Sequence, residues 1–315
     1  MRRLFVTVAV CCCGLAIHAG ELKPIATVHL SCESPSQFVS PSGEQVAVRC
    51  TDHSIRIVDI ATGREQHVFP SDDHVTDYSF SRDGRWFAVG LRSGSAEIVP
   101  TSGSGEPKPW KATTRGVSAI EFLADDDSIL IAGNDEPGQI WDVSGIPKVR
   151  ATLHSDFAGL TASAISSDGK QLATAEGDTV LRVYDTSTWK VAREYPDLKL
   201  ETFAVAFTAD GKFLLAGGVE DYISLIDLSS GHETHRLGGE VGSVIEIMPL
   251  GDSQRAVTMY FNEDTLKTHW AVWNLETLKT EPLTAERPFT GGGIVHGKRW
   301  FVSATGNSLQ IWEYQ

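Results

Sequence analysis

Hydrophobic and polar positions repeat along the chain with a period of about 42 residues, the spacing typical of a repeat architecture. In the first repeated pattern, a tight-turn residue precedes a run rich in apolar and β-branched residues. The turn residue recurs at Gly43, Gly84, Asp127, Gly169, Gly211, Asp252 and Gly297. In the second pattern, an alternating run ends, in most copies, in a polar residue. That end recurs at Asp59, Pro100, Asp142, Asp185, Asp227, Asn274 and Glu313. The two patterns together predict seven copies of one structural unit.

Each copy has the pattern of four short strands separated by turns. In the fifth copy, residues 203–207, 213–216 and 222–227 are predicted as strands, and residues 233–237 form a fourth, more polar run. A polar fourth strand fits the outer edge of a sheet. Because one such sheet cannot bury both of its faces, neighbouring sheets are expected to stack on one another.

The repeated unit resembles a known family of proteins. Its third strand ends in Trp141-Asp142 or in a comparable apolar-Asp pair, and the turns at residues 59–63, 81–84 and 227–231 are also similar to those of WD-repeat β-propellers. The resemblance covers about residues 21–315 and implies an all-β fold, a seven-bladed β-propeller of four-stranded antiparallel blades, of a secreted or periplasmic bacterial type. The chain departs from the family because no Gly-His pair precedes each first strand, and because Pro100, Asn274 and Glu313 replace the terminal Asp.

The resemblance also implies the domain organisation. We expect one propeller over residues 20–315, in which residues 20–31 supply the outer strand of blade 7 and so close the ring. The chain ends two residues after the seventh polar marker, which leaves that blade without an outer strand of its own. The seven blades are predicted at residues 32–73, 74–115, 116–157, 158–199, 200–239, 240–285 and 286–315.

Residues 1–19 have the pattern of a secretory signal peptide. Two arginines follow Met1, residues 4–17 are uncharged and mostly apolar, and small residues follow. The apolar run is too short to span a bilayer. A secreted or periplasmic location is therefore expected. The alternatives are an apolar first strand or a lipoprotein anchor, and the anchor is less favoured because Val10 precedes Cys11.

Cleavage after residue 19 would leave Cys32 and Cys50 as the only cysteines. In a compartment that permits disulfides they could form one bridge. In the resembling fold the loops that hold them lie on one rim, which makes Cys32–Cys50 a candidate disulfide. Two free, partly buried thiols remain the alternative.

The charge of the chain restricts its partners. Its formal net charge is −14, from 27 basic and 41 acidic residues, and binding to nucleic acid depends on clustered Lys and Arg. Nucleic acid is therefore not expected as a partner, and no segment is expected to span a membrane.

Acidic residues concentrate in the loops between second and third strands, where Arg92 is the main exception. The candidate partner-binding rim consists of Asp52, Arg92, Asp135, Glu136, Asp178, Glu220, Asp221, Glu263 and Asp264, and Glu176 lies in the same set of loops. A rim of this kind would attract a basic protein or peptide. One alternative is that these acids are only turn formers. A less favoured alternative is a cation site in the central channel of the resembling fold.

Known catalytic and cofactor patterns are not found in the sequence. There is no phosphate-binding Gly-rich loop and no nucleophile elbow, and Gly291 to Gly293 precede a strand instead of a helix. His232 and His235 would face opposite sides of a strand, so they are interpreted as surface residues. The tryptophans, including Trp86, Trp141 and Trp273, are expected to pack between blades. No catalytic residue, metal or cofactor is predicted.

The sequence favours a non-catalytic scaffold, a monomer or one subunit of a complex, that binds a protein or peptide. One alternative is an enzyme or cofactor binder similar to the quinoprotein propellers, because Asp59-x-x-Thr62-Gly63 matches part of their blade motif. The other alternative is a structural subunit of an envelope complex.

Overall fold

The computed structural model describes residues 22–32, 36–40, 44–52, 54–69, 73–102, 109–154, 159–177, 179–198, 201–240, 242–281, 291–295, 298–305 and 307–314. Regular structure in these ranges is β-strand, apart from one short 3₁₀ turn, η1 (Pro196–Leu198). The strands form seven four-stranded antiparallel sheets, which is consistent with a propeller. The predicted signal peptide, residues 1–19, lies outside the described residues.

Two compact units make up the chain. The terminal unit combines Glu21–Leu153 with Phe289–Gln315, and the middle unit lies within His154–Pro288. The terminal unit holds four of the sheets and the middle unit holds three.

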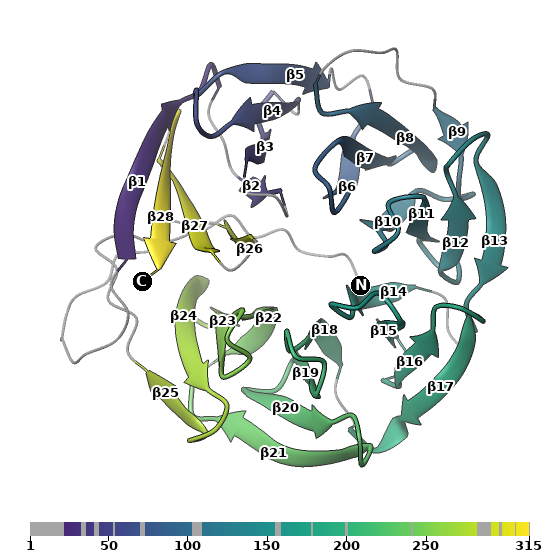
Figure 1. Cartoon of the computed structure of the whole chain (residues 1–315), viewed down its shortest axis with the longest axis vertical. Coiled ribbons are helices and arrows are strands. Elements are labelled where there is room, and N and C mark those ends of the chain that lie inside the picture. Colours follow the sequence, from purple (N-terminus) through teal and green to yellow (C-terminus); the bar gives the residue numbers. More distant parts are fainter. Residues whose placement is uncertain are drawn as a thin grey trace. The chain divides into compact units, whose positions relative to one another are not determined.

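The sheets of the terminal unit follow the predicted copies (Figure 1). One sheet contains β2 (Ser36–Val39), β3 (Gln45–Arg49), β4 (Ile55–Asp59) and β5 (Glu65–Phe69). The next contains β6 (Val75–Phe80), β7 (Trp86–Leu91), β8 (Ser95–Pro100) and β9 (Trp110–Lys111). A third contains β10 (Val117–Phe122), β11 (Ser128–Gly133), β12 (Gln139–Asp142) and β13 (Lys148–Thr152). The fourth has the order β1 (Leu22–His29), β28 (Ser308–Tyr314), β27 (Lys298–Thr305) and β26 (Gly291–Val295).

The three sheets of the middle unit have the same order of strands. The first contains β14 (Leu160–Ile165), β15 (Gln171–Glu176), β16 (Leu181–Asp185) and β17 (Lys190–Tyr195). The second contains β18 (Thr202–Phe207), β19 (Phe213–Gly218), β20 (Tyr222–Asp227) and β21 (His232–Gly238). The third contains β22 (Ser243–Pro249), β23 (Arg255–Asn262), β24 (Lys267–Asn274) and β25 (Lys279–Glu281).

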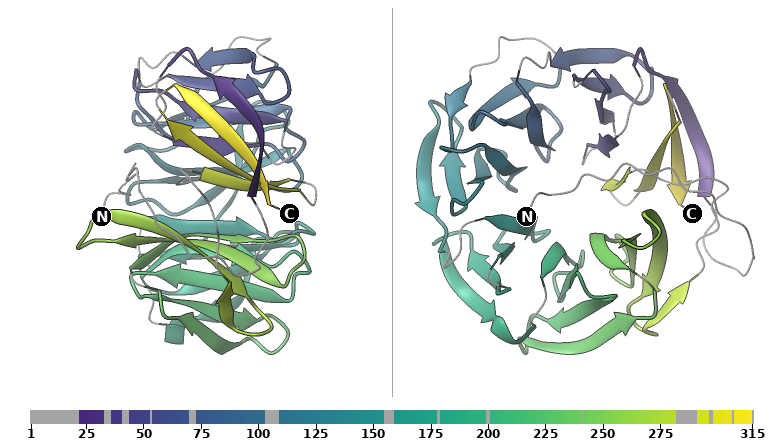
Figure 2. Two further views of the ribbon diagram at one scale, coloured as in Figure 1. Left: turned by 90° about the vertical axis from the view of Figure 1, so that its left-hand side faces the viewer. Right: turned by 180° about the vertical axis from the view of Figure 1, so that it is seen from behind.

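The strand nearest the N-terminus pairs with the strand nearest the C-terminus. β1 and β28 are antiparallel, with Leu22 opposite Tyr314 and His29 opposite Ser308, and they lie side by side in both views of Figure 2. β1 is paired on one side only, so it forms the outer edge of this sheet.

The polar residues that end the third strands cap the turns that follow. Oδ1 of Asp59 accepts a hydrogen bond from the Thr62 N–H at 2.7 Å, and Oδ1 of Asn274 accepts one from the Thr277 N–H at 2.8 Å. Asn offers the same acceptor oxygen as Asp, which explains why Asn274 can replace the usual acid. The hydrogen bond from the Thr62 hydroxyl is the main cause that lowers the pKa of Asp59.

The turn before the second strand requires a residue with positive φ. Five residues take this conformation, with φ between 57° and 72°: Gly84, Asp126, Gly169, Gly211 and Ser253. The sequence-based assignment of this position to Asp127 and Asp252 is therefore wrong by one residue in each of these two copies. In the second of them, Oδ1 of Asp252 accepts the Gln254 N–H at 3.0 Å and so caps the turn. Gly43 and Gly297 lie outside the described residues.

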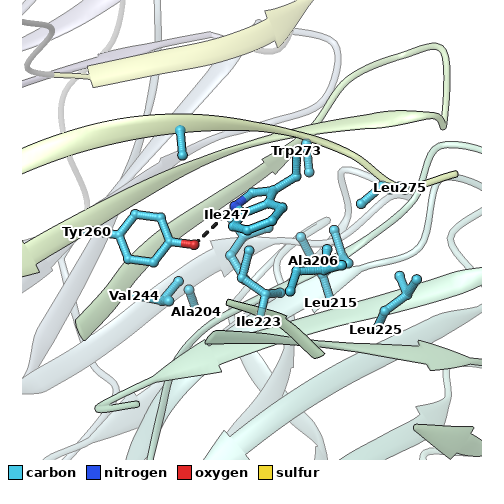
Figure 3. Packing of buried hydrophobic residues seen from close by; sticks show 13 residues of the cluster. Ala204, Ala206, Leu215, Ile223, Leu225, Val244, Ile247, Tyr260, Trp273 and Leu275 are labelled. Carbon is cyan, nitrogen blue, oxygen red and sulfur yellow. Dashed lines mark hydrogen bonds between the residues drawn. The ribbon is translucent and has the colours of Figure 1, made fainter. Parts of the chain in front are cut away.

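Apolar side chains pack between successive sheets of the same unit. In the terminal unit, Ile57 of one sheet packs with Phe80 of the next. In the middle unit, Leu215 packs with Ile247 and Trp273 of the following sheet (Figure 3). The expected burial of the tryptophans holds for Trp141 and Trp273 but is wrong for Trp86, which is 39% exposed. Trp86 is the first residue of β7, directly after the turn, and the four residues that follow it in the strand are buried.

Two hydrogen bonds from backbone N–H groups to side chains also protect a strand edge in the terminal unit. β10 is the first strand of its sheet, so N–H groups on its free side have no partner in the ladder. Oδ2 of Asp77 accepts the Ile120 N–H at 3.0 Å, and Oγ of Ser79 accepts the Phe122 N–H at 3.1 Å. Both acceptors come from β6 of the preceding sheet, which therefore ties two sheets together with polar as well as apolar contacts.

Candidate interaction rim

The predicted rim residues lie in the loops between second and third strands. Asp52 lies between β3 and β4, Arg92 between β7 and β8, Asp135 and Glu136 between β11 and β12, Glu220 and Asp221 between β19 and β20, and Glu263 and Asp264 between β23 and β24. Asp178 falls outside the described residues. The rim therefore has a part in the terminal unit and a part in the middle unit.

Asp52 is engaged by its own loop and by β4. Its Oδ1 accepts hydrogen bonds from the Ser54 N–H at 2.9 Å and from the Ser54 hydroxyl at 2.6 Å. Its Oδ2 lies 3.2 Å from Nη2 of Arg56. The Ser54 hydrogen bonds, with a smaller contribution from Arg56, hold the pKa of Asp52 below its ordinary value. The Asp52 carboxylate therefore stabilises the conformation of its own loop, and Arg56 compensates its charge.

The acids between β11 and β12 are paired with the loop that precedes β10. Oδ2 of Asp135 lies 3.0 Å from Nη1 of Arg115, and both side chains are 71% exposed. Oε1 of Glu136 accepts a hydrogen bond from the Thr114 N–H at 2.7 Å and another from the Thr114 hydroxyl. Arg92, in the neighbouring loop between β7 and β8, is exposed and adds a positive charge to this part of the rim.

Glu176 does not belong to the rim, contrary to the sequence-based expectation. It ends β15 and is 4% exposed. Its Oε2 lies 3.1 Å from Nη1 of Arg182, and Nε of the same guanidinium lies 3.0 Å from Oε1 of Glu194. Glu176 lies opposite Leu160 of β14, and its buried carboxylate needs a cation.

The two rim loops of the middle unit differ from those of the terminal unit. We call residues 219–221 and 263–266 the open acidic loops. Asp221, Glu263 and Asp264 are exposed. Within the described ranges, no ion pair or side-chain hydrogen bond involves any of these three carboxylates. Side chains in the described part of the chain therefore leave their charge uncompensated.

Apolar side chains accompany these free acids. Val219 is 46% exposed and Leu266 is 62% exposed. Glu220 is half-buried, and its Oε2 has no hydrogen-bond partner in the described part of the chain. Exposed aliphatic residues beside unpaired carboxylates form a mixed surface that suits another protein better than it suits a simple ion.

An aromatic and ionisable group lies close to the open acidic loops. Tyr260 is fully buried, accepts a hydrogen bond from Nε1 of Trp273 at 3.0 Å (Figure 3), and stacks on His269 with ring centres 5.1 Å apart. Nε2 of His269 lies 3.3 Å from Oε2 of Glu240. Burial raises the pKa of Tyr260, and the charges of Glu240 and Asp221 raise it further. This group was not predicted from the sequence, because the opposition of Tyr260 and His269 depends on the register of β23 with β24.

The candidate disulfide lies in the terminal unit. The structure joins Cys32 to Cys50, with Cα atoms 5.8 Å apart. Nearby, Oε1 of Glu65 accepts hydrogen bonds from the Ser31 N–H at 3.0 Å and from the Ser31 hydroxyl at 2.6 Å. The disulfide therefore lies beside a polar cluster that also holds the segment after β1.

Other sequence motifs have structural explanations. His232 and His235 are both exposed on β21. Asp59, Thr62 and Gly63 form a capped turn, with Gly63 at a φ of 68°, so the part of the quinoprotein motif that they match is used for chain reversal. Among the described residues, no group of three or more His, Cys, Asp or Glu could hold a metal ion, and no helix is long and apolar enough to cross a membrane.

Comparison with known proteins gives distant relatives. No family model matches the chain. It is 24% identical to the U3 small nucleolar RNA-associated protein 15 homolog of Xenopus tropicalis over 156 residues, which cover 49% of this chain and 29% of that protein. It is 23% identical to the protein groucho of Drosophila melanogaster over 252 residues, covering 70% of this chain and 32% of that protein. It is 24% identical to the SEC12-like protein 1 of Arabidopsis thaliana over 219 residues, which cover 64% of this chain and 54% of that protein.

These relatives are WD-repeat proteins. This chain spans 29%, 32% and 54% of their respective lengths. The similarity agrees with the seven four-stranded sheets of the structure. The chain is therefore similar, at low identity, to WD-repeat proteins in its sequence and in its repeated β-sheets.

Proposed function

We propose that this protein is a non-catalytic interaction scaffold that binds a basic segment of another protein through the open acidic loops of its middle unit. The observation that carries the proposal is that Asp221, Glu263 and Asp264 are exposed and have no cation or hydrogen-bond donor among the described side chains. The similarity to WD-repeat proteins supports a scaffold role.

Physical chemistry favours a basic partner with some apolar side chains. Unpaired carboxylates on a protein with a net charge of −14 attract cations over several ångströms. Lys or Arg side chains of a partner would gain charge-assisted hydrogen bonds without displacing an existing ion pair. Val219 and Leu266 would add apolar contact area beside those bonds.

The proposal extends to the arrangement of the sheets and to the location of the protein. Seven sheets in series, and an outer strand of the last one contributed by β1, support a closed seven-bladed ring. The N-terminal pattern of residues 1–19 supports export before folding. N-terminal sequencing of the protein from its native host would test the export: a mature chain that begins near Gly20 is expected, and a chain that begins at Met1 would overturn it.

The binding proposal can be tested with a defined probe. The probe is a synthetic peptide of alternating Lys and Leu, and its affinity is measured by calorimetry for the wild type and for the triple variant Asp221→Asn, Glu263→Gln and Asp264→Asn. These positions are exposed, so the substitutions are expected to leave the fold intact. We expect the wild type to bind in a salt-sensitive manner and the triple variant to lose at least tenfold in affinity.

Asp135→Asn provides the matched control. Asp135 is as exposed as the three tested acids, but Arg115 already neutralises it. Its removal is expected to leave the affinity for the Lys-Leu peptide within twofold of the wild type. Equal affinities for all three proteins would contradict the proposed function.

A further inference from the structure

The segment that follows β1 is connected to three other segments of the terminal unit, by two hydrogen bonds and one disulfide. The Leu30 N–H donates to the Asn307 carbonyl oxygen at 2.7 Å, the Ser31 N–H donates to Oε1 of Glu65 at 3.0 Å, and Cys32 is bonded to Cys50. Consecutive residues thus carry a backbone, a side-chain and a covalent connection. Such density of attachment is unusual for a segment that leads out of an edge strand, because such segments commonly fray.

The polar part of this attachment is a charged cluster on the sheet that contains β4 and β5. Nη1 of Arg56 lies 3.1 Å from Oε2 of Glu65 and also donates to the Ser31 hydroxyl. Nη2 of the same guanidinium lies 3.2 Å from Oδ2 of Asp52. The Arg56 side chain is 15% exposed, and that of Glu65 is 24% exposed. The carboxylate of Glu65 therefore bridges Ser31 to a partly buried cation.

The apolar part of the attachment places the disulfide next to the pairing of β1 with β28. Cys50 is 1% exposed and packs in one cluster with Val28 and Leu30 from the N-terminal segment and with Leu309 and Ile311 of β28. Cys32 is half-buried against the same cluster. The bridge thus connects the end of the N-terminal segment to the core on which β1 rests.

β1 depends on this attachment more than an inner strand would. Among the described strands it pairs with β28 alone. An edge strand held by one ladder can exchange between paired and unpaired states unless the chain next to it is restrained. The connections at residues 30–32 supply that restraint.

We propose that the Cys32–Cys50 disulfide is a redox-sensitive latch that holds β1 on β28. A dithiol reductant opens the latch by supplying two electrons and two protons. The Sγ–Sγ bond breaks, Cys32 and Cys50 become thiols, and the reductant closes into its own disulfide. In the opened state the Leu30 hydrogen bond to Asn307, the Glu65 cluster and the ladder still hold the segment, but the covalent connection is gone, so β1 separates more often and leaves the edge of β28 unpaired. This latch is independent of the binding surface in the middle unit.

Hydrogen exchange followed by mass spectrometry tests the latch on the full-length protein. The air-oxidised protein is compared before and after treatment with dithiothreitol, and the two thiols are counted by alkylation in each sample. We expect peptide mapping to find neither Cys32 nor Cys50 alkylated before treatment and both of them alkylated after it. Reduction should then speed amide exchange in Leu22–His29 and Ser308–Tyr314 at least tenfold, while exchange in β14 to β21 of the middle unit stays unchanged.

Two variants keep the test decisive. Cys32→Ser with Cys50→Ser should reproduce the reduced exchange pattern and make it insensitive to dithiothreitol. Glu65→Gln should enlarge the effect of reduction on β1, because it removes the carboxylate that holds Ser31. Free Cys32 and Cys50 thiols in the air-oxidised protein would overturn the proposal. Unchanged exchange of β1 and β28 after reduction would also overturn it, and so would an equal increase in every sheet.

Discussion

The acidic loops of the terminal unit and those of the middle unit have similar composition but different chemistry. Asp52, Asp135 and Glu136 each contact a cation or a hydrogen-bond donor of the same unit. Asp221 and Glu263 have neither among the described side chains. The number of acids in a loop therefore does not determine how much uncompensated charge the loop offers to a partner.

The difference originates in the loop that enters each sheet. Before β10 this loop supplies Thr114 and Arg115, which reach the acids between β11 and β12. The loop before β18 supplies Glu201, and the loop before β22 supplies Glu240. Among the described residues of these two entry loops the charged side chains are acids, so none of them neutralises the neighbouring carboxylates.

The largest predicted effect concerns a buried ion pair of the middle unit. Arg182→Ala should reduce the free energy of unfolding by about 3–5 kcal/mol, because Glu176 would keep a buried, uncompensated charge. The matched change in the terminal unit is Arg115→Ala, which breaks an ion pair whose side chains are both 71% exposed and should cost at most about 1 kcal/mol. Denaturant unfolding measures both, and similar losses for the two variants would refute this difference.

The next effect concerns the covalent connection, which the described part of the middle unit lacks. Replacement of both Cys32 and Cys50 by Ser should lower the free energy of unfolding by about 3 kcal/mol, the chain-entropy value for a loop of this size. Denaturant unfolding of the double variant in non-reducing buffer checks this value. A double variant as stable as the oxidised wild type would show that the bridge does not restrain the unfolded chain.

The smallest predicted effect concerns pH and Asp52. The pKa of Asp52 is lowered in the folded protein by the Ser54 hydrogen bonds and by Arg56. A lowered folded pKa gives stability that is present above the ordinary pKa of the carboxyl, about 4, and is lost as the pH falls through the folded value. Asp52→Asn keeps the acceptor oxygen for Ser54 but removes the charge. Its stability deficit relative to wild type should therefore be present at pH 7 and should shrink below pH 4 in thermal unfolding measurements; a deficit that does not change with pH would count against the assignment.

The strands could be predicted from the sequence because their signals are local. The alternation that ends at Asp59 and Asp227 directly encodes a strand followed by a capped turn. The turn positions at Asp127 and Asp252 were wrong by one residue because Asp, unlike Gly, serves both as cap and as the left-handed residue. Local patterns identify the turn but do not assign these two roles.

The state of each rim acid could not be predicted, because it depends on contacts across the sheet. Asp135 is paired with a residue 20 positions earlier in the chain, and the buried Glu176 is paired with Arg182 of the next strand. The exposure of Trp86 likewise depends on what lies over the start of β7. The sequence therefore identified the acids of the open acidic loops as rim residues. It could not distinguish them from the rim acids that are paired.

A charge-swap measurement tests the central claim most directly. The affinities of two peptides, alternating Lys-Leu and alternating Glu-Leu, are measured for the wild type and for a variant with Lys at positions 221, 263 and 264. We expect the wild type to prefer the Lys-Leu peptide at least tenfold and the variant to lose or reverse that preference. A variant that still prefers the Lys-Leu peptide as strongly as the wild type would contradict the claim that the open acidic loops form the binding surface.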